Sequence, residues 1–194
     1  MDLDRFCVKL FAKSGADIDE AHYINIFHEW IRKNQLEGLL LDVVDYRHIP
    51  NGPGIMLISH ETNYAMDHEG GEFGVYAQRK LGLPGESADK SHSDKIVDLV
   101  KSTAKFSSLL EADNRLDGEL SIDGSGFLYM TNDRLHAPNT DETFAALKSD
   151  LEAAAASLYP GKAVTVTRVE TDARDRLSAK VSVSEAVAAA ALVA

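Results

Sequence analysis

The chain is nearly free of cysteine. Cys7 is the only one among 194 residues, which excludes a disulfide within the chain. Long apolar runs are also missing, since none reaches the roughly 18 residues that a membrane-spanning helix needs. The first ten residues, MDLDRFCVKL, lack the basic-then-apolar pattern of a signal peptide. These absences predict a cytoplasmic protein that does not enter a membrane.

Positive charge is scarce as well. The sequence has 20 Lys and Arg residues against 31 Asp and Glu residues, a net charge of −11. Its densest basic groups, Arg79-Lys80 and Arg174 with Arg176, are diluted by nearby acids. Such a surface repels phosphate backbones, so the sequence predicts no nucleic-acid partner. The acidity itself is typical of a protein kept soluble by its charge.

Motifs for nucleotide binding and nucleophilic catalysis are missing too. The glycine-rich loops at residues 51–54 and 124–126 match neither the dinucleotide fingerprint nor the phosphate loop, so we expect no cofactor. Ser59 precedes His60 but lacks the G-x-S-x-G frame of a nucleophile elbow. Cys7 lies in an apolar stretch and is predicted to be an inert core thiol.

What the sequence does contain is ordinary globular composition, with 44% hydrophobic and 26% charged residues. Patterns of period 2 and period 3.6 alternate along it and predict a single α+β domain over residues 1–183, with a mixed sheet of about eight strands and three main helices. A parallel or next-but-one strand pairing is expected near the start, where strand, helix and strand follow closely. Strands are expected at 6–12, 39–46, 54–60, 72–78, 119–122, 127–131, 163–170 and 177–183, and helices from Asp19 to about 34, from Ser93 to about 112, and from Asn139 or Thr140 to Pro160.

Two turn signals stand out between these elements. Residues 50–54, PNGPG, predict a tight turn between two strands. Residues 123–126, DGSG, predict a hairpin that joins the strands on either side.

The last eleven residues, 184–194, form an alanine-rich tail. Ser184 and Glu185 favour the start of a helix, but a helix this short is marginal alone. We expect it to pack on the body of the protein. The alternative is that the tail docks onto a protein partner.

The most informative stretch runs from residue 39 to residue 67. Its two apolar runs each lead into polar residues: Asp45, Tyr46 and His48 after the first, and His60 and Glu61 after the second. If the ends of the two strands adjoin, these groups form an acid–base set. The sequence thus predicts a site in which the two polar corners meet, although a hydrogen-bonded network at a sheet edge explains the same residues.

Metal binding by this stretch is disfavoured. His60-Glu61 and His68-Glu69 offer ligands that zinc accepts, but the two histidines are eight residues apart, unlike the H-E-x-x-H spacing of a helical zinc site. On a strand, His60 and Glu61 point to opposite faces. We therefore predict no metal site.

A second polar segment, residues 131–139, reads TNDRLHAPN. It follows a predicted strand and leads into a helix, whose first N–H groups attract anions. Arg134 is placed to hold a carboxylate or phosphate, with Asn132 beside it. The alternative is that Arg134 pairs with Asp133 or binds loop carbonyl groups.

These segments resemble an uncharacterised family of bacterial proteins of about this length. The family pattern reads D-V-x-D-Y-x-H-V-P-x-G-P-G, then H-E-x-x-Y-x-x-D, then N-D-R-L-x-A-P-N, and the resemblance covers most of residues 1–160. Ile49 stands where the pattern has Val. The resemblance implies no activity, but it implies that the polar segments belong to one site. The matching positions are Asp42, Asp45, Tyr46, His48, Gly52, Pro53, Gly54, His60, Glu61, Tyr64, Asp67, Asn132, Asp133, Arg134, Leu135, Ala137, Pro138 and Asn139.

Two functions from different classes fit these observations. The first is a non-catalytic binding or adaptor protein, self-associating through an exposed strand, whose polar cluster binds a small polar ligand or organises the surface for a partner. The second is a small hydrolase-like or isomerase-like enzyme with His60 as base, Asp45 or Glu61 as its orienting carboxylate, and Arg134 as anion holder. We favour the first, because no nucleophile frame, metal spacing or phosphate loop is found. Its candidate ligand-binding residues are Tyr46, His48, Tyr64, Asp67, Asn132 and Arg134.

Overall fold

The structure is a computed structural model that describes residues 1–50, 52–83, 85–87 and 89–193. Asn51, in the predicted PNGPG turn, lies outside the described residues. The strands are β1 (Phe6–Ser14), β2 (Leu40–Asp45), β3 (Ile55–Ser59), β4 (Thr62–Asp67), β5 (Gly74–Arg79), β6 (Ser121–Ile122), β7 (Gly126–Thr131), β8 (Val164–Val169) and β9 (Ser178–Val183). The helices are α1 (Ala21–Lys33), α2 (His92–Glu111) and α3 (Asp141–Leu158), with three short 3-10 turns at Glu69–Gly71, Asn114–Leu116 and Ala189–Leu192. The predicted α+β class, with three helices beside one sheet, is confirmed.

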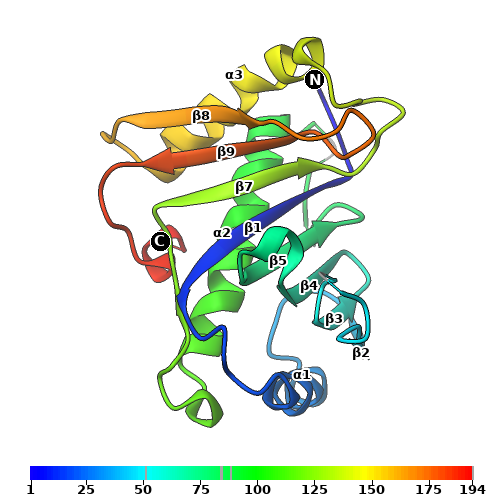
Figure 1. Cartoon of the computed structure of the whole chain (residues 1–194), viewed down its shortest axis with the longest axis vertical. Helices are drawn as coiled ribbons and strands as arrows, with labels where there is room; N and C mark the ends of the chain where they lie inside the picture. Colours follow the sequence, from blue (N-terminus) through cyan, green and yellow to red (C-terminus); the bar gives the residue numbers. More distant parts are fainter. Residues whose placement is uncertain (51, 84, 88, 194) are drawn as a thin grey trace.

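The strands form one sheet in the order β2-β3-β4-β5-β1-β7-β9-β8 (Figure 1). Every pairing among the described residues is antiparallel, so the expected parallel or next-but-one pairing, and with it the mixed sheet, is wrong. The reason is the path of the chain after α1. Instead of returning beside β1, the chain enters the sheet at its far edge as β2, and the meander β2-β3-β4-β5 then leads back to β1.

The three helices cover one face of the sheet. In Figure 1, α2 runs behind the central strands, α3 lies behind the β8 end and α1 lies at the other end. Alternate residues of β1, namely Phe6, Val8 and Leu10, point toward the helices and are fully buried in the main core. An aromatic group built from Phe27, Trp30 and Phe106 fills the space between α1 and α2.

Helices α2 and α3 begin at side-chain caps close to those predicted, whereas the N-cap residue of α1, Glu20, makes no side-chain cap hydrogen bond. Thr140 caps α3 by accepting a hydrogen bond from Thr143 N, one of the two starts that the sequence allowed. The cap of α2 is Ser91, which accepts from Asp94 N, rather than Ser93. Before α1, Asp19 accepts from Ala21 N.

Two local predictions failed. Strand β4 was not expected, because TNYAMD is buried on both faces of the sheet and shows no polar alternation. The predicted hairpin across residues 123–126 is absent: β6 pairs with β1, not with β7. Asp123 explains the difference, since its carboxylate bonds Ser125 N while its own N–H donates to Phe11 O, which holds the loop against β1.

The tail packs on the body, as favoured. Ala189 and Leu192 are buried in the core, and their 3-10 turn lies against α2. The predicted helix there is only this short 3-10 turn. Ala194 lies outside the described residues.

In the described part of the chain, no helix has the length and apolar character needed to cross a membrane.

Candidate functional site

The two polar corners predicted to meet lie at opposite ends of the β2–β3 hairpin. Asp45 pairs with Ile55 at one end, and Leu40 pairs with Ser59 at the other. Asp45, with Tyr46 and His48, is therefore a whole strand length from His60 and Glu61. The prediction that the corners form one site is wrong, because the short connection between the two strands makes them antiparallel.

Asp45 forms an ion pair within its own turn. Its carboxylate accepts hydrogen bonds from Arg47 Nε and Nη2, at 3.0 and 2.6 Å. These bonds lower the pKa of Asp45 to about 2. Tyr46 and His48 stand beside this turn with ring centroids 6.3 Å apart, and His48 is exposed. This corner therefore fits a hydrogen-bonded sheet edge better than a reaction centre.

His60 occupies the turn between β3 and β4 and is exposed to solvent. Its Nδ1 lies 3.5 Å from Glu61 Oε1, while Glu61 Oε2 accepts from Leu39 N. Ser59, the adjacent hydroxyl, is bonded to the backbone of Thr62 instead. No nucleophile among the described residues is therefore activated by His60 here.

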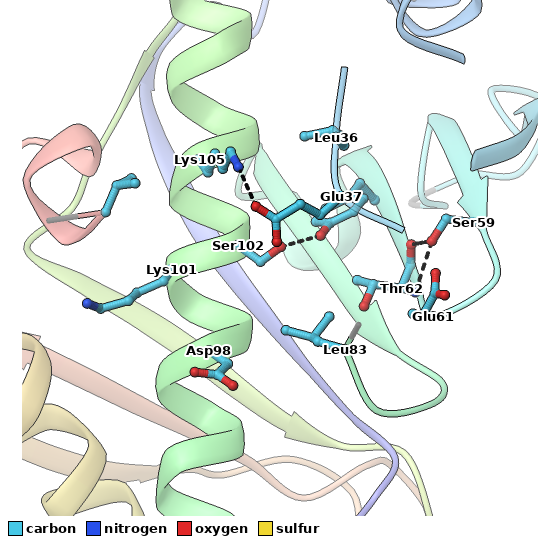
Figure 2. Close-up of a pocket in the computed structure, with 12 residues that line it drawn as sticks. Leu36, Glu37, Ser59, Glu61, Thr62, Leu83, Asp98, Lys101, Ser102 and Lys105 are labelled. Atoms are coloured by element: carbon cyan, nitrogen blue, oxygen red, sulfur yellow. Dashed lines mark hydrogen bonds and ion pairs between the residues drawn. The ribbon is translucent and has the colours of Figure 1, made fainter. Parts of the chain in front are cut away.

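Glu61 and Tyr64 line a groove of about 430 Å³ between this turn and α2 (Figure 2). The Tyr64 hydroxyl lies 2.5 Å from Ser102 Oγ, and Lys105 Nζ lies 2.8 Å from Glu37. Burial raises the pKa of Tyr64 to about 12, so its hydroxyl stays protonated. Tyr64 and Lys105 are thus already bonded to neighbours at this groove, whereas Thr62 Oγ1 has no hydrogen-bond partner among the described residues. Of the predicted site residues the groove gathers only Glu61 and Tyr64, so it is the weaker candidate for a ligand site.

A larger hollow lies on the sheet face that no helix covers. We name this hollow, of about 820 Å³, the basin. It gathers three predicted residues, Asp67, Asn132 and Arg134, and so joins the second and third motif segments. The side chains that form its floor and rim are Lys9, Phe11, Asp67, Glu69, Glu72, Leu128, Met130, Asn132, Arg134, Val169, Thr171, Arg174, Asp175, Arg176, Ser178 and Lys180.

The floor of the basin contains a buried ion pair. Lys9 Nζ lies 2.5 Å from Asp67 Oδ2 and donates a second hydrogen bond to Glu69 O. Each of these two side chains is only about 3% exposed or less. Burial raises the pKa of Asp67, although the Lys9 ammonium opposes the rise. The rest of the floor is apolar, with Phe11 and Met130.

The rim carries positive charge. Arg134 and Lys180 are exposed, and neither forms an ion pair with a carboxylate of any described residue. Arg134 instead donates to Arg174 O, the loop-carbonyl alternative that the sequence allowed, and Lys180 stands 5.2 Å from the centre of the Phe11 ring. Arg174 is paired with Asp172.

A chain of polar groups runs from the exposed Glu69 at the rim to the buried Tyr76 and Cys7. Arg176 bonds Glu69 at 2.8 Å and the Tyr76 hydroxyl at 3.3 Å, and Tyr76 donates to Cys7 Sγ at 2.8 Å. Burial raises the pKa of the Cys7 thiol to about 11. The interpretation of Cys7 as an inert core thiol agrees with this environment.

Sequence reasoning missed the four cations Lys9, Arg174, Arg176 and Lys180. The sequence holds a signal for two of them. Lys9 interrupts the apolar run FCVKLFA, and Lys180 lies between the buried residues Ala179 and Val181. Because side chains alternate along a strand, both lysines point to the face opposite the core. In the described part of the chain, no group of three His, Cys, Asp or Glu residues is arranged to hold a metal ion.

Comparison of the chain with known protein families and with curated proteins finds no match, and none of the solved structures matches it. The resemblance to a bacterial family stays a prediction.

Proposed function

We propose that this protein is a non-catalytic binding protein that holds a small organic anion in the basin. One observation carries the proposal. Over the whole chain acids outnumber bases by 31 to 20, yet the basin is lined by five Lys or Arg residues and four Asp or Glu residues. A local reversal of charge in an acidic protein favours an anionic ligand at that place.

The pairing within the basin indicates where the anionic group sits. Lys9 is neutralised by Asp67, and Arg176 by Glu69. Arg134 and Lys180 have no such partner among the described residues, so a ligand carboxylate or sulfonate gains most from these two cations. Their exposure makes them reachable without rearranging the sheet.

The floor defines the rest of the ligand. Phe11, Leu128 and Met130 form an apolar surface bordered by these cations. A flat aromatic or aliphatic portion would pack on this surface while its acidic group meets the rim. The volume of about 820 Å³ is within the usual range for a small-molecule site.

The separation of His60 from Asp45 supports a binding role over the enzyme alternative. A hydrolase or isomerase needs its base, orienting group and anion holder together, and Arg134 lies in the basin whereas His60 lies in the β3–β4 turn. We further propose that the protein works in the cytoplasm, that it binds no nucleic acid, and that it self-associates. A protein partner for the tail finds no support, because its apolar residues Ala189 and Leu192 are already buried.

The experiment compares two probes of similar size and different charge. Titration calorimetry and NMR shift mapping are carried out with 1-naphthoate and with uncharged 1-naphthalenemethanol. We expect 1-naphthoate to bind and to shift resonances of Leu128, Met130 and Lys180, and the alcohol to bind more weakly. Arg134→Gln and Lys180→Met should each weaken naphthoate binding by about tenfold, the loss of one charge-assisted hydrogen bond.

Lys33→Met serves as the matched control, because Lys33 is an exposed lysine on α1 that pairs with Glu29 and does not line the basin. It should leave the affinity unchanged. Equal affinity for the two probes, or equal loss in the control and the rim variants, would refute an anion site in the basin.

A further inference from the structure

Strand β8 forms an open edge of the sheet (Figure 1). The hydrogen bonds of β9 show which groups of β8 face outward. Leu177 O and Val183 N bond to β7 and its preceding loop, so the odd-numbered residues of β9 face β7 and the even-numbered ones face β8. The register Lys180↔Thr167 then leaves the N–H and C=O groups of Val164, Val166 and Arg168 directed away from the sheet.

The outward N–H and C=O groups form no backbone hydrogen bond with any described residue. Helix α3 does not cover the edge, because it packs on the face of the strand, where Val164 and Val166 join the core. A regular edge strand with free N–H and C=O groups is a template for pairing with another strand.

The two edges of the sheet differ in how they resist such pairing. Edge strand β2 has a bulge between Leu40 and Asp42, and it carries the carboxylates of Asp42 and Asp45. Both features discourage strand addition. Strand β8 pairs with β9 without a bulge, and its first four residues, Val164 to Thr167, are uncharged. Only Arg168 is charged, and its guanidinium is held by Asp141 and Asn139.

We propose that β8 pairs with β8 of a second copy of this chain, antiparallel, with the two-fold axis at Val166. This register places outward groups opposite outward groups: Val166 meets Val166, and Val164 meets Arg168 of the second copy. Three such pairs exchange about six backbone hydrogen bonds. The two sheets become one continuous sheet, and the interface is isologous.

The side chains fit the same register. Thr165 lies opposite Thr167 of the second copy on the open face, and threonine pairs of this kind are favourable. Beyond these pairs the register brings Lys162, which ion-pairs with Glu185 of its own chain, opposite Glu170 of the second copy. No like charges face each other along the pairing, so the charges of a second copy are compatible with this edge. This inference rests on the proposed self-association, for which it names the surface, and it does not depend on the basin.

The test uses two variants that differ at one residue. Thr165→Glu/Thr167→Glu places glutamate opposite glutamate in the proposed register, whereas Thr165→Lys/Thr167→Glu places lysine opposite glutamate. Both threonines are exposed, and the Thr167→Glu change common to both variants puts a carboxylate beside Lys180. We therefore expect the fold of each protomer to tolerate these substitutions. Circular dichroism and thermal melting verify folding.

Light scattering after gel filtration and sedimentation velocity give the mass. We expect the wild type and the Lys/Glu variant to sediment at twice 21.2 kDa at high protein concentration, and the Glu/Glu variant at 21.2 kDa. A monomeric wild type at every concentration overturns the proposal. A Glu/Glu variant that stays dimeric overturns it as well, since the dimer then uses another surface.

Discussion

Lys9 Nζ and Asp67 Oδ2 lie 2.5 Å apart in the floor of the basin, and both side chains are almost fully buried. They come from β1 and β4, which are separated in the sheet by β5. The pair therefore crosses over an intervening strand and connects the two halves of the open face. Breaking it leaves one buried charge without a partner.

Lys9→Met should lower the free energy of unfolding by about 3–5 kcal/mol, because Asp67 keeps its desolvation cost and loses its cation. The double variant Lys9→Met/Asp67→Leu should recover most of that loss, since no buried charge remains. Urea denaturation followed by circular dichroism measures both. If the double variant is as unstable as the sum of the single variants, the two residues are not coupled.

His92 should make stability fall in mild acid. It is buried, its Nδ1 accepts from Leu3 N, and its Nε2 lies 3.0 Å from the Tyr129 hydroxyl. Burial lowers its pKa from 6.5 to about 4. Between these values the unfolded chain binds more protons than the folded one, so stability rises with pH through this window and is fully present above about pH 6.5.

The expected loss between pH 7 and pH 4 is about 3 kcal/mol for this one group. His92→Gln should reduce this loss of unfolding free energy. Urea denaturation at a series of pH values measures the unfolding free energy of both proteins. Parallel stability curves for the wild type and His92→Gln would show that His92 titrates alike in the folded and unfolded states.

The sequence predicted which segments form helices and strands better than it predicted which of these segments lie side by side. The helical stripe of Phe27 and Trp30 and the strand FCVKLFA are local patterns, and both form as expected. Strand order depends on long-range packing, so the placement of β2 at the far edge has no local signal. The position of the site also depends on contacts between distant segments. The antiparallel β2–β3 hairpin separates Asp45 from His60. The packing of the sheet brings Asp67 and Arg134, from distant segments, into the same basin.

Cys7 should react with thiol reagents only when the protein unfolds. Its side chain is fully buried, and its thiol accepts a hydrogen bond from Tyr76. With a pKa of about 11, the thiolate is scarce at pH 8. Ellman's reagent should label the denatured chain at once and the native protein at a rate that follows unfolding. Immediate labelling of the native protein would show that the thiol is accessible.

Phe106→Ala tests the aromatic group between α1 and α2. The Phe106 ring stacks on Tyr64 at 4.6 Å and meets Trp30 edge-on at 5.2 Å, so truncation should cost about 3–5 kcal/mol of unfolding free energy. Trp30 is the sole tryptophan, and its fluorescence reports on this space directly. A red shift of its emission in the native variant indicates that water has entered.

Phe11→Ala is the matched control, because Phe11 lies half-buried on the opposite face of the sheet. The same truncation there should cost less than about 2 kcal/mol, since less apolar surface leaves water on folding. Its Trp30 emission should equal that of the wild type. Equal losses for the two variants would mean that this position on the open face contributes as much to stability as one in the main core, which is incompatible with the larger buried cluster lying between the sheet and the helices.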